Sequence, residues 1–273
     1  MRATDFRAIL RLTDQEHWGF GTRDLRRMLR LAPKGCLVAA EHGRPIGLTT
    51  AITYGKNLGW IGNVLVQRRH RGAGVGTKLV ESAVGHLRRE VRSIGLNSYP
   101  EEKSMYERLN FNAIESFVRL STSRPIGKKT SEKRDAPFSQ ILELDRRLSG
   151  VDRSRLLRVL HSEFRRNWAW ILNGSRVSGY SLVKEYRDSS EIGPIVCEEM
   201  SLSTVSTLLQ SSMVLAGRQP LELSVPESNR TALEAASLLG FRVEREGLVM
   251  CLADLDKVYI SPAIAAFGFL DKG

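Results

Sequence analysis

The positions of hydrophobic residues in the first half of the chain predict strands that alternate with helices. Helices are predicted where apolar residues recur every three or four positions, and strands where short β-prone runs are bounded by turn residues. By this criterion helices lie at residues 22–31, from residue 77 onward and at 101–109, and strands at 36–40, 46–54, 60–66 and 94–98. Residues 6–12 are interpreted as a strand that runs into the start of a helix. The alternation favours an α/β fold.

The second half of the chain repeats the pattern of the first at a nearly fixed spacing. Three residues recur at offsets of 132, 131 and 130 positions, namely Gly47 as Gly179, Gly62 as Gly193 and Phe111 as Phe241. Such self-similarity indicates a duplicated fold. Residues 121–136 between the halves are polar, basic and nearly free of large apolar side chains, which is typical of a linker. We therefore predict an N-terminal domain at 1–122, a linker at 123–136 and a C-terminal domain at 137–273.

Charge and cysteine content limit the partners and the compartment. The chain carries 41 Lys and Arg against 30 Asp and Glu, a net charge of +11, which suits a phosphate-rich ligand, nucleic acid or simply a solvated basic surface. Its three cysteines are far apart among apolar neighbours, as expected of buried thiols in a reducing compartment rather than of disulfides or a metal site. No apolar signal core or membrane-spanning stretch is recognised. We expect a cytoplasmic protein without a metal and without a membrane partner.

The segment most informative about chemistry is glycine-rich and lies between a predicted strand and a predicted helix. Gly72, Gly74 and Gly76 allow a tight turn, and the amides of the turn and of the following helix start would attract a phosphate anion. A P-loop requires Lys directly after its last glycine, whereas Thr77 stands there. A dinucleotide fingerprint has the spacing G-x-G-x-x-G, whereas this run is G-x-G-x-G. Both of these phosphate-binding schemes fit badly.

The same segment resembles the Q/R-x-x-G-x-G/A motif of the GNAT N-acetyltransferase superfamily. Arg71, Gly74 and Gly76 occupy the defining positions of that motif. Further along, residues 105–111 (MYERLNF) are similar to the family's L-Y-E-x-x-G-F signature. The resemblance covers about residues 1–120, and the repeat makes the chain similar to tandem GNAT proteins with a degenerate second copy. It implies two domains, each with a mostly antiparallel mixed sheet whose central strands splay apart.

The resemblance also implies a role for individual residues. Backbone groups of Leu65 and Val66 would pair with the pantetheine arm of acetyl-CoA, like an added strand, and an amide there would polarise the thioester carbonyl. The Tyr106 hydroxyl would protonate the departing thiolate, unless this side chain is only part of the core. The amine would attack the thioester directly, without a covalent enzyme intermediate. The pyrophosphate would be held by Arg71, Gly72, Ala73, Gly74, Val75, Gly76 and Thr77.

Some positions depart from the family pattern. Asn63 stands on the strand where many relatives keep a carboxylate base, and it could hold a water instead. Asn110 replaces a glycine of the second motif, and Asn tolerates the left-handed conformation. Trp60 is expected to pack against the helices, and Trp18 to lie either in the core or in the wall of an acceptor pocket. The other candidates for a general base are Glu16, His17, Glu101 and Glu102.

The second copy lacks the features that would bind the cofactor. Glu198 and Glu199 stand where the first copy has its glycine-rich loop, and two carboxylates would repel a pyrophosphate. Ala236 stands where the first copy has Tyr106. We therefore expect one active site, in the first domain, with the second domain shaping an acceptor pocket or the surface of a homodimer.

Three classes of function follow from these patterns. The first is an acetyl-CoA-dependent N-acetyltransferase that acts on an unknown amine, either a small molecule or a protein. The alternative is a non-catalytic acyl-CoA-binding sensor or regulatory protein. Nucleic-acid binding is suggested only by the charge and lacks a helix-turn-helix, zinc or aromatic RNA-binding signature, so we do not expect it.

Overall fold

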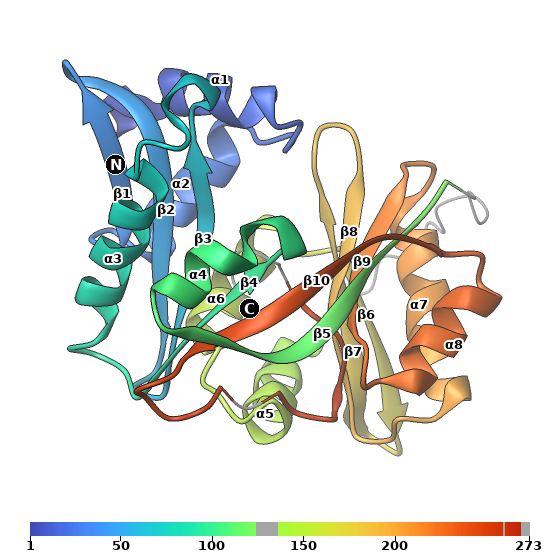
Figure 1. The fold of residues 1–273 in the computed structure, drawn as a ribbon. Helices are drawn as coiled ribbons and strands as arrows, with labels where there is room; N and C mark the ends of the chain where they lie inside the picture. Colours follow the sequence, from blue (N-terminus) through green and yellow to red (C-terminus); the bar gives the residue numbers. More distant parts are fainter. Residues whose placement is uncertain (124–135, 259, 269–273) are drawn as a thin grey trace. The chain divides into compact units, whose positions relative to one another are not determined.

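Two compact units make up the described part of the chain. A computed structural model describes residues 1–123, 136–258 and 260–268. The first unit contains residues 1–114 and 249–258, and the second contains 115–248 and the described residues 260–268 (Figure 1). Most of the predicted linker 123–136 lies outside the described residues. Strand β5 (Phe111–Thr122) leads from the first unit into the second, and β10 (Arg242–Leu252) leads back.

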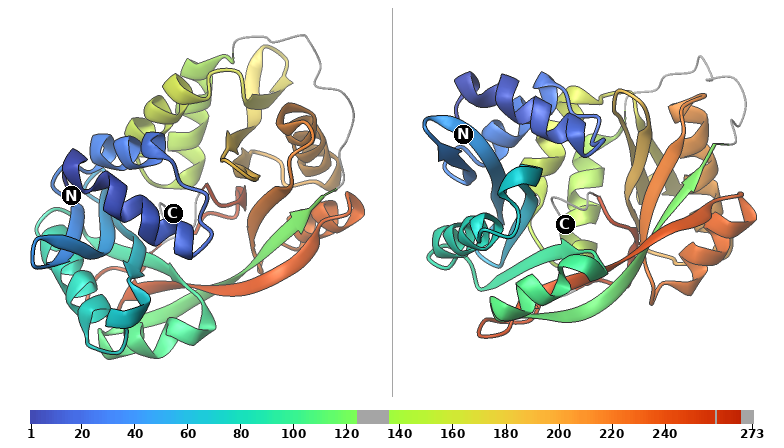
Figure 2. Two further views of the ribbon diagram at one scale, coloured as in Figure 1. Left: turned by 90° about the horizontal axis from the view of Figure 1, so that it is seen from above. Right: turned by 45° about the horizontal axis from the view of Figure 1, so that its top comes forward.

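The first unit is a mixed sheet with strand order β1-β2-β3-β4-β10-β5. Strands β1, β2 and β3 are antiparallel neighbours, whereas β3 and β4 run parallel. Helices α1 and α2 cover one face of these strands and α3 covers the other (Figures 1 and 2). The remaining bounds are α1 (Phe6–Gln15), α2 (Thr22–Leu31), β1 (Cys36–Glu41), β2 (Arg44–Tyr54), β3 (Leu58–Val66), α3 (Val75–Leu87), β4 (Ser93–Ser98) and α4 (Lys103–Arg108), with 3-10 turns at Ala3–Asp5, Arg68–His70 and Pro100–Glu102.

The predicted elements of this unit are present, with one correction. Residues 6–12 do not form a strand but lie in α1, which starts at Phe6. Phe6, Ile9 and Leu12 are buried, and their spacing of three places them on one face of a helix. A run of seven residues has too few apolar positions to distinguish the helical period of 3.6 residues from the strand period of 2. The hairpin of β1 and β2, the strand β3 and the helix α2 are confirmed.

The second unit repeats the plan, with strand order β10-β5-β9-β8-β7-β6. Helices α5 and α6 lie on one face of its sheet and α7 and α8 on the other (Figure 1). A continuous hydrophobic core joins α7 and α8 to β8 and β9. The bounds are α5 (Phe138–Ser149), α6 (Ser154–Glu163), β6 (Trp168–Asn173), β7 (Arg176–Glu185), β8 (Ser190–Cys197), α7 (Leu202–Ala216), β9 (Leu221–Pro226), α8 (Arg230–Leu238) and β11 (Ile264–Ala266).

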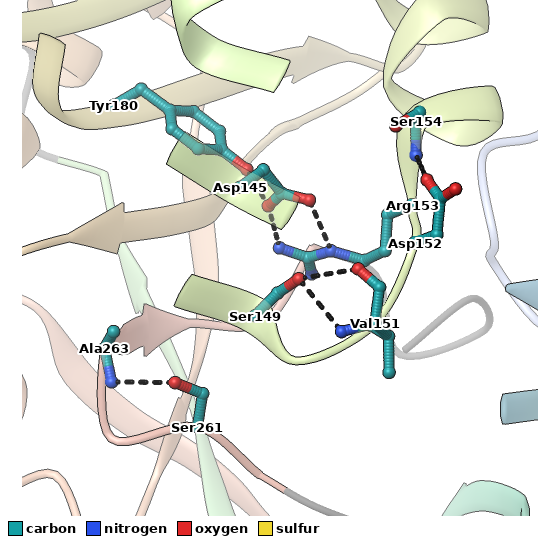
Figure 3. A network of polar contacts seen from close by, with 9 residues as sticks. All are labelled: Asp145, Ser149, Val151, Asp152, Arg153, Ser154, Tyr180, Ser261 and Ala263. Carbon is teal, nitrogen blue, oxygen red and sulfur yellow. Dashed lines mark hydrogen bonds and ion pairs between the residues drawn. The ribbon is translucent and has the colours of Figure 1, made fainter. Parts of the chain in front are cut away.

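A buried ion pair fixes the start of the second unit. Asp145 of α5 accepts hydrogen bonds from the guanidinium group of Arg153 and from the hydroxyl of Tyr180 (Figure 3). Asp145 is 1% exposed and Arg153 is 4% exposed. A buried charge is tolerated only when it is paired, so these partners hold α5, the start of α6 and β7 in one arrangement. Burial, reinforced by the Asp145 carboxylate, raises the pKa of Tyr180.

Of the helices in the described part of the chain, none combines the length and hydropathy needed to cross a membrane. All three cysteines, Cys36, Cys197 and Cys251, are free and buried, as the sequence predicted.

Candidate active site

The strands β3 and β4 stay paired along only part of their length. Their parallel ladder runs from Leu58 opposite Ser93 to Ile61 opposite Leu96 and then ends. Strand β3 continues to Val66, and the two strands diverge there (Figure 1). Among the described residues no strand pairs with this side of residues 62–66. We call this stretch the open edge of β3. An extended molecule could add to it as a further strand.

The register with β2 determines which backbone groups point to the open edge. Val66 lies opposite Gly47, and the amide of Gln67 donates to the carbonyl of Ile46. In an antiparallel ladder this pattern marks Val66 and Gly47 as a non-hydrogen-bonded pair, so the N–H and C=O of Val66 point away from β2. The groups of Leu65 alternate with them and point toward Leu48 in β2. By the same alternation, those of Val64 face the open edge.

Asn63 forms a bulge at the beginning of the open edge. Its φ is 52°, in the left-handed region, and the β2–β3 register shifts between Leu48 and Thr50. The Asn63 side chain is buried, and its amide nitrogen donates to the hydroxyl of Thr50 at 2.9 Å. An extra residue bends a strand away from its neighbour, so this bulge helps to separate β3 from β4. A buried amide group that already donates a hydrogen bond is not a general base.

The glycine-rich corner follows the open edge directly. Gly72 and Gly74 both have φ of 77°, and a side chain at either position would meet no atom within 4 Å. Gly74 caps α3 in the left-handed conformation, which favours glycine. No described group accepts a hydrogen bond from the amides of residues 72–77. The corner is therefore an exposed set of amide donors at the positive end of a 13-residue helix.

Three charged side chains surround the corner. Arg71 donates from Nε to the carbonyl of Val66 at 3.0 Å and from its terminal nitrogen to Glu16 at 2.7 Å. Arg68 donates to the same Glu16 oxygen at 3.0 Å. The Glu16 carboxylate is thus held by two guanidinium groups. Both arginines are exposed and can also reach an anion.

Tyr106 lies on α4 beside this corner. A side chain on Gly76 would lie 3.5 Å from Sδ of Met105 and 3.6 Å from Val66, so α4 packs close to the start of α3. Tyr106 is 5% exposed and contacts Phe111 edge to face, with 6.2 Å between ring centroids. Burial, and secondarily the Glu102 carboxylate, raise the pKa of Tyr106 well above its ordinary value. The hydroxyl therefore keeps its proton at neutral pH, as a general acid must.

The remaining sequence candidates are placed as follows. Asn110 has φ of 67°, which confirms the left-handed conformation expected where the motif has glycine. Trp60 is buried, and its ring lies against Gly95 of the neighbouring strand β4. Trp18 is half-buried and packs against Phe20. Glu101, Glu102 and His17 are exposed.

A cavity of about 280 Å³ contains none of the predicted site residues and is lined by Glu81, Val84, Gly85, Arg88, Leu109 and Leu252. In the described ranges no group of three or more His, Cys, Asp or Glu side chains is arranged to hold a metal ion.

Comparison with known proteins decides the family. Residues 4–111 match the model of the Acetyltransferase (GNAT) family, and residues 141–257 match that of an Acetyltransferase (GNAT) domain. The chain is a GNAT acyltransferase with two GNAT domains. The duplication and the fold class predicted from the sequence are thereby confirmed.

The relatives of this tandem GNAT protein are distant in sequence. A holothin acyltransferase from Pseudoalteromonas sp. (strain SANK 73390) is 24% identical over 224 residues, which are 76% of this chain and 74% of that protein. A structure from Pyrococcus horikoshii, provisionally described as an acetyltransferase, has a TM-score of 0.81 and 22% identity, covering 100% of this chain and 94% of the other. A GCN5-related N-acetyltransferase from Sphaerobacter thermophilus has a TM-score of 0.65 and 16% identity, covering 95% and 96%. At these identities the structures show the fold alone.

Two features of this region were not predicted from the sequence. The first is that the backbone groups of Val64, and not those of Leu65, face the open edge. This depends on the β2–β3 register, which the bulge at Asn63 shifts, so alternation counted from the start of β3 does not predict it. The pairing of Glu16 with Arg68 and Arg71 joins residues more than fifty positions apart. Only opposite charge could have suggested it, and the chain has many such pairs.

Proposed function

We propose that this chain transfers the acetyl group of acetyl-CoA to an amine, at one active site in its first domain. The observation that carries the proposal is the continuity of the open edge of β3 with the amide donors of residues 72–77. A thioester cofactor needs an extended polar arm and a diphosphate to be bound next to each other. The catalytic domain in this proposal comprises residues 1–122. A linker at 123–136 joins it to the second domain at 137–273.

The open edge of β3 binds the pantetheine arm in this proposal. The amide and carbonyl groups of Val66 point to that side, and those of Val64 take the place that the sequence alone gave to Leu65. Residue 64 or 66 also supplies an amide that polarises the thioester carbonyl. An amide fixed by a strand needs no reorganisation when charge develops on that oxygen.

The glycine-rich corner binds the diphosphate. The amides of residues 72–77 supply hydrogen bonds and Arg71 supplies charge, with Arg68 close by. Gly72 and Gly74 leave the space in front of these amides free of side chains. The net charge of +11 adds a general attraction for an anionic substrate.

Tyr106 supplies the acid in the transfer step. The neutral amine attacks the carbonyl carbon, a C–N bond forms, the C–S bond breaks, and the departing sulfur takes the proton of the Tyr106 hydroxyl. The amine loses one proton to solvent, and the phenolate regains one from solvent. We assign no general base, because Glu16 is paired with two arginines and Asn63 donates to Thr50.

The similarity to a holothin acyltransferase supports acyl transfer, and it leaves the acceptor of this chain to experiment. We would incubate the full chain with acetyl-CoA and a panel of amines, and follow CoA release and acetylated product by mass spectrometry. Acetylation of an amine at a rate that Arg71→Ala lowers supports the proposal. Binding of acetyl-CoA without turnover of any acceptor favours the acyl-CoA sensor. Turnover only with a longer acyl-CoA would replace acetyl as the donor group.

A further inference from the structure

In the second unit, the position that matches the open edge of β3 is occupied by the chain itself. The parallel ladder of β8 and β9 consists of Ser190 opposite Leu221 and Glu191 opposite Glu222, and β8 continues to Cys197. Beyond the end of that ladder, β11 pairs with β8, with Ile264 opposite Val196 and Ala266 opposite Ile195.

The backbone groups involved are the counterparts of those proposed to bind acetyl-CoA. Cys197 lies opposite Gly179, and the amide of Glu198 donates to Ser178, which repeats the pattern at Val66, Gly47 and Gln67. Cys197 therefore turns its amide away from β7, as Val66 turns its own away from β2. The Cys197 amide donates to the carbonyl of Ala263 at 3.1 Å.

The segment 261–268 also bonds to the opposite strand, β9, and to its surroundings. The amide of Phe267 donates to the carbonyl of Ser224, at 2.8 Å, beyond the last β8–β9 pair. The side chain of Asn229 donates to the carbonyl of Ile264 at 3.0 Å. The buried ammonium group of Lys184 donates to the carbonyl of Gly268 and is neutralised by Glu191 at 2.8 Å. Both splayed strands are thus bridged by one extended peptide.

Side-chain packing matches the backbone pairing. Ala265 and Ala266 belong to the hydrophobic core of the second unit. Phe267 packs edge to face on Phe117, with ring centroids 6.0 Å apart. A side chain at position 193 would lie 2.0 Å from the carbonyl oxygen of Phe267, so only glycine allows this approach.

The stretch that follows Cys197 also lacks the glycine-rich run of the first copy. Glu198 and Glu199 stand there, and Glu198 is paired with Arg147 and, at 2.9 Å, with Arg176. Helix α7 begins at Leu202, and the side chain of its N-cap Ser201 accepts a hydrogen bond from the amide of Thr204. The second domain therefore adds negative charge where the first has arginines and glycines.

We propose that the gap between β8 and β9 is a peptide-binding site whose ligand is the chain's own segment 261–268, and that this segment permanently excludes acyl-CoA from the second domain. The peptide site stands on the contacts of the second unit alone; only its equivalence to the cofactor's place rests on the proposed function.

Two measurements on the full chain test this proposal. Calorimetric titration with acetyl-CoA is expected to give one molecule per chain, and hydrogen exchange is expected to be at least ~100-fold slower for the amides of Cys197 and Phe267 than for an unstructured peptide. Two molecules per chain would overturn the proposal, as would rapid exchange of the segment. No bound acetyl-CoA together with a protected segment would overturn the proposed function and leave the peptide site intact.

A variant separates the segment from general stability. Phe267→Asp places a charge in the apolar contact with Phe117, so exchange at Ile195 and Cys197 should become at least ~10-fold faster while the first unit is unchanged. The matched control is Leu238→Asp, which adds the same charge at a side chain that is 69% exposed and should leave these amides protected. Equal protection in Phe267→Asp and the wild type would refute the assignment. Should Phe267→Asp fail to fold, the wild-type exchange still decides.

Discussion

The assignment of Tyr106 as the acid leads to a quantitative prediction for Tyr106→Phe. The substitution removes one hydroxyl group and keeps the ring, so the edge-to-face contact with Phe111 at 6.2 Å is retained. Because proton donation to the thiolate occurs only in the transition state, kcat and kcat/KM should fall together. General acid catalysis contributes roughly 10²–10⁴-fold, which corresponds to about 3–5 kcal/mol of barrier. The KM for acetyl-CoA should not change.

The pH dependence of the wild type gives a second readout for the same residue. Burial and Glu102 raise the pKa of Tyr106, so the acid form persists into the alkaline range and activity should not decline through loss of this proton below about pH 10. The same shift favours folding below the pKa of the unfolded tyrosine, and this contribution is lost as the pH rises through the folded value. Between neutral and high pH, the free energy of unfolding should therefore fall less in Tyr106→Phe than in the wild type.

Initial rates of CoA release from pH 6 to 10, with the best acceptor from the amine panel, would test this prediction. Tyr54→Phe is the matched control. Tyr54 is also a buried tyrosine, but it lies opposite Leu58, at the end of β2 that is remote from Gly47 and Val66. Its rate should equal that of the wild type. If Tyr106→Phe keeps its kcat within about threefold, Tyr106 belongs only to the core and the acid role is wrong.

Three further predictions concern the corner, the buried ion pair and a thiol. Gly74→Ala puts a side chain at φ 77° in front of the amide donors and should raise the KM for acetyl-CoA at least ~10-fold in steady-state kinetics; an unchanged KM would contradict the diphosphate site. Asp145→Asn leaves the buried Arg153 without its carboxylate and should lower the free energy of unfolding by about 3–5 kcal/mol in urea titrations, whereas the exposed control Asp152→Asn should stay within about 0.5 kcal/mol. Burial and Glu199 raise the pKa of Cys197 to about 12, so labelling of the native protein at pH 8 should show no reaction of this thiol with a thiol reagent. The free energy of unfolding should fall as the pH rises from 9 toward 12, and unfolding titrations at each pH check this.

The sequence by itself determined the elements and the glycine-rich corner that we propose as the diphosphate site. Strand and helix periods from Thr22 to Ser98 are local properties, because each element buries its own apolar face at its own period. The glycine-rich run is local too, since the turn, its amides and the following helix start are adjacent in the chain. The repeat at offsets near 131 also needs no coordinates. Residues 6–12 were wrongly interpreted as a strand, because so short a run contains too few apolar residues to distinguish the helical period from the strand period.

Tertiary structure alone decided which parts of distant segments meet. The choice of Val64 over Leu65 depends on a register that the bulge at Asn63 shifts by one residue, and such a shift reverses the direction of every following group. Residues 249–252 of β10 belong to the first unit, and segment 261–268 lies beside Cys197. Both arrangements bring together residues that are tens to hundreds of positions apart in the chain. They are made by backbone hydrogen bonds, which almost any residue can form, so the sequence carries little trace of them beyond a glycine at 193 that admits the carbonyl of Phe267.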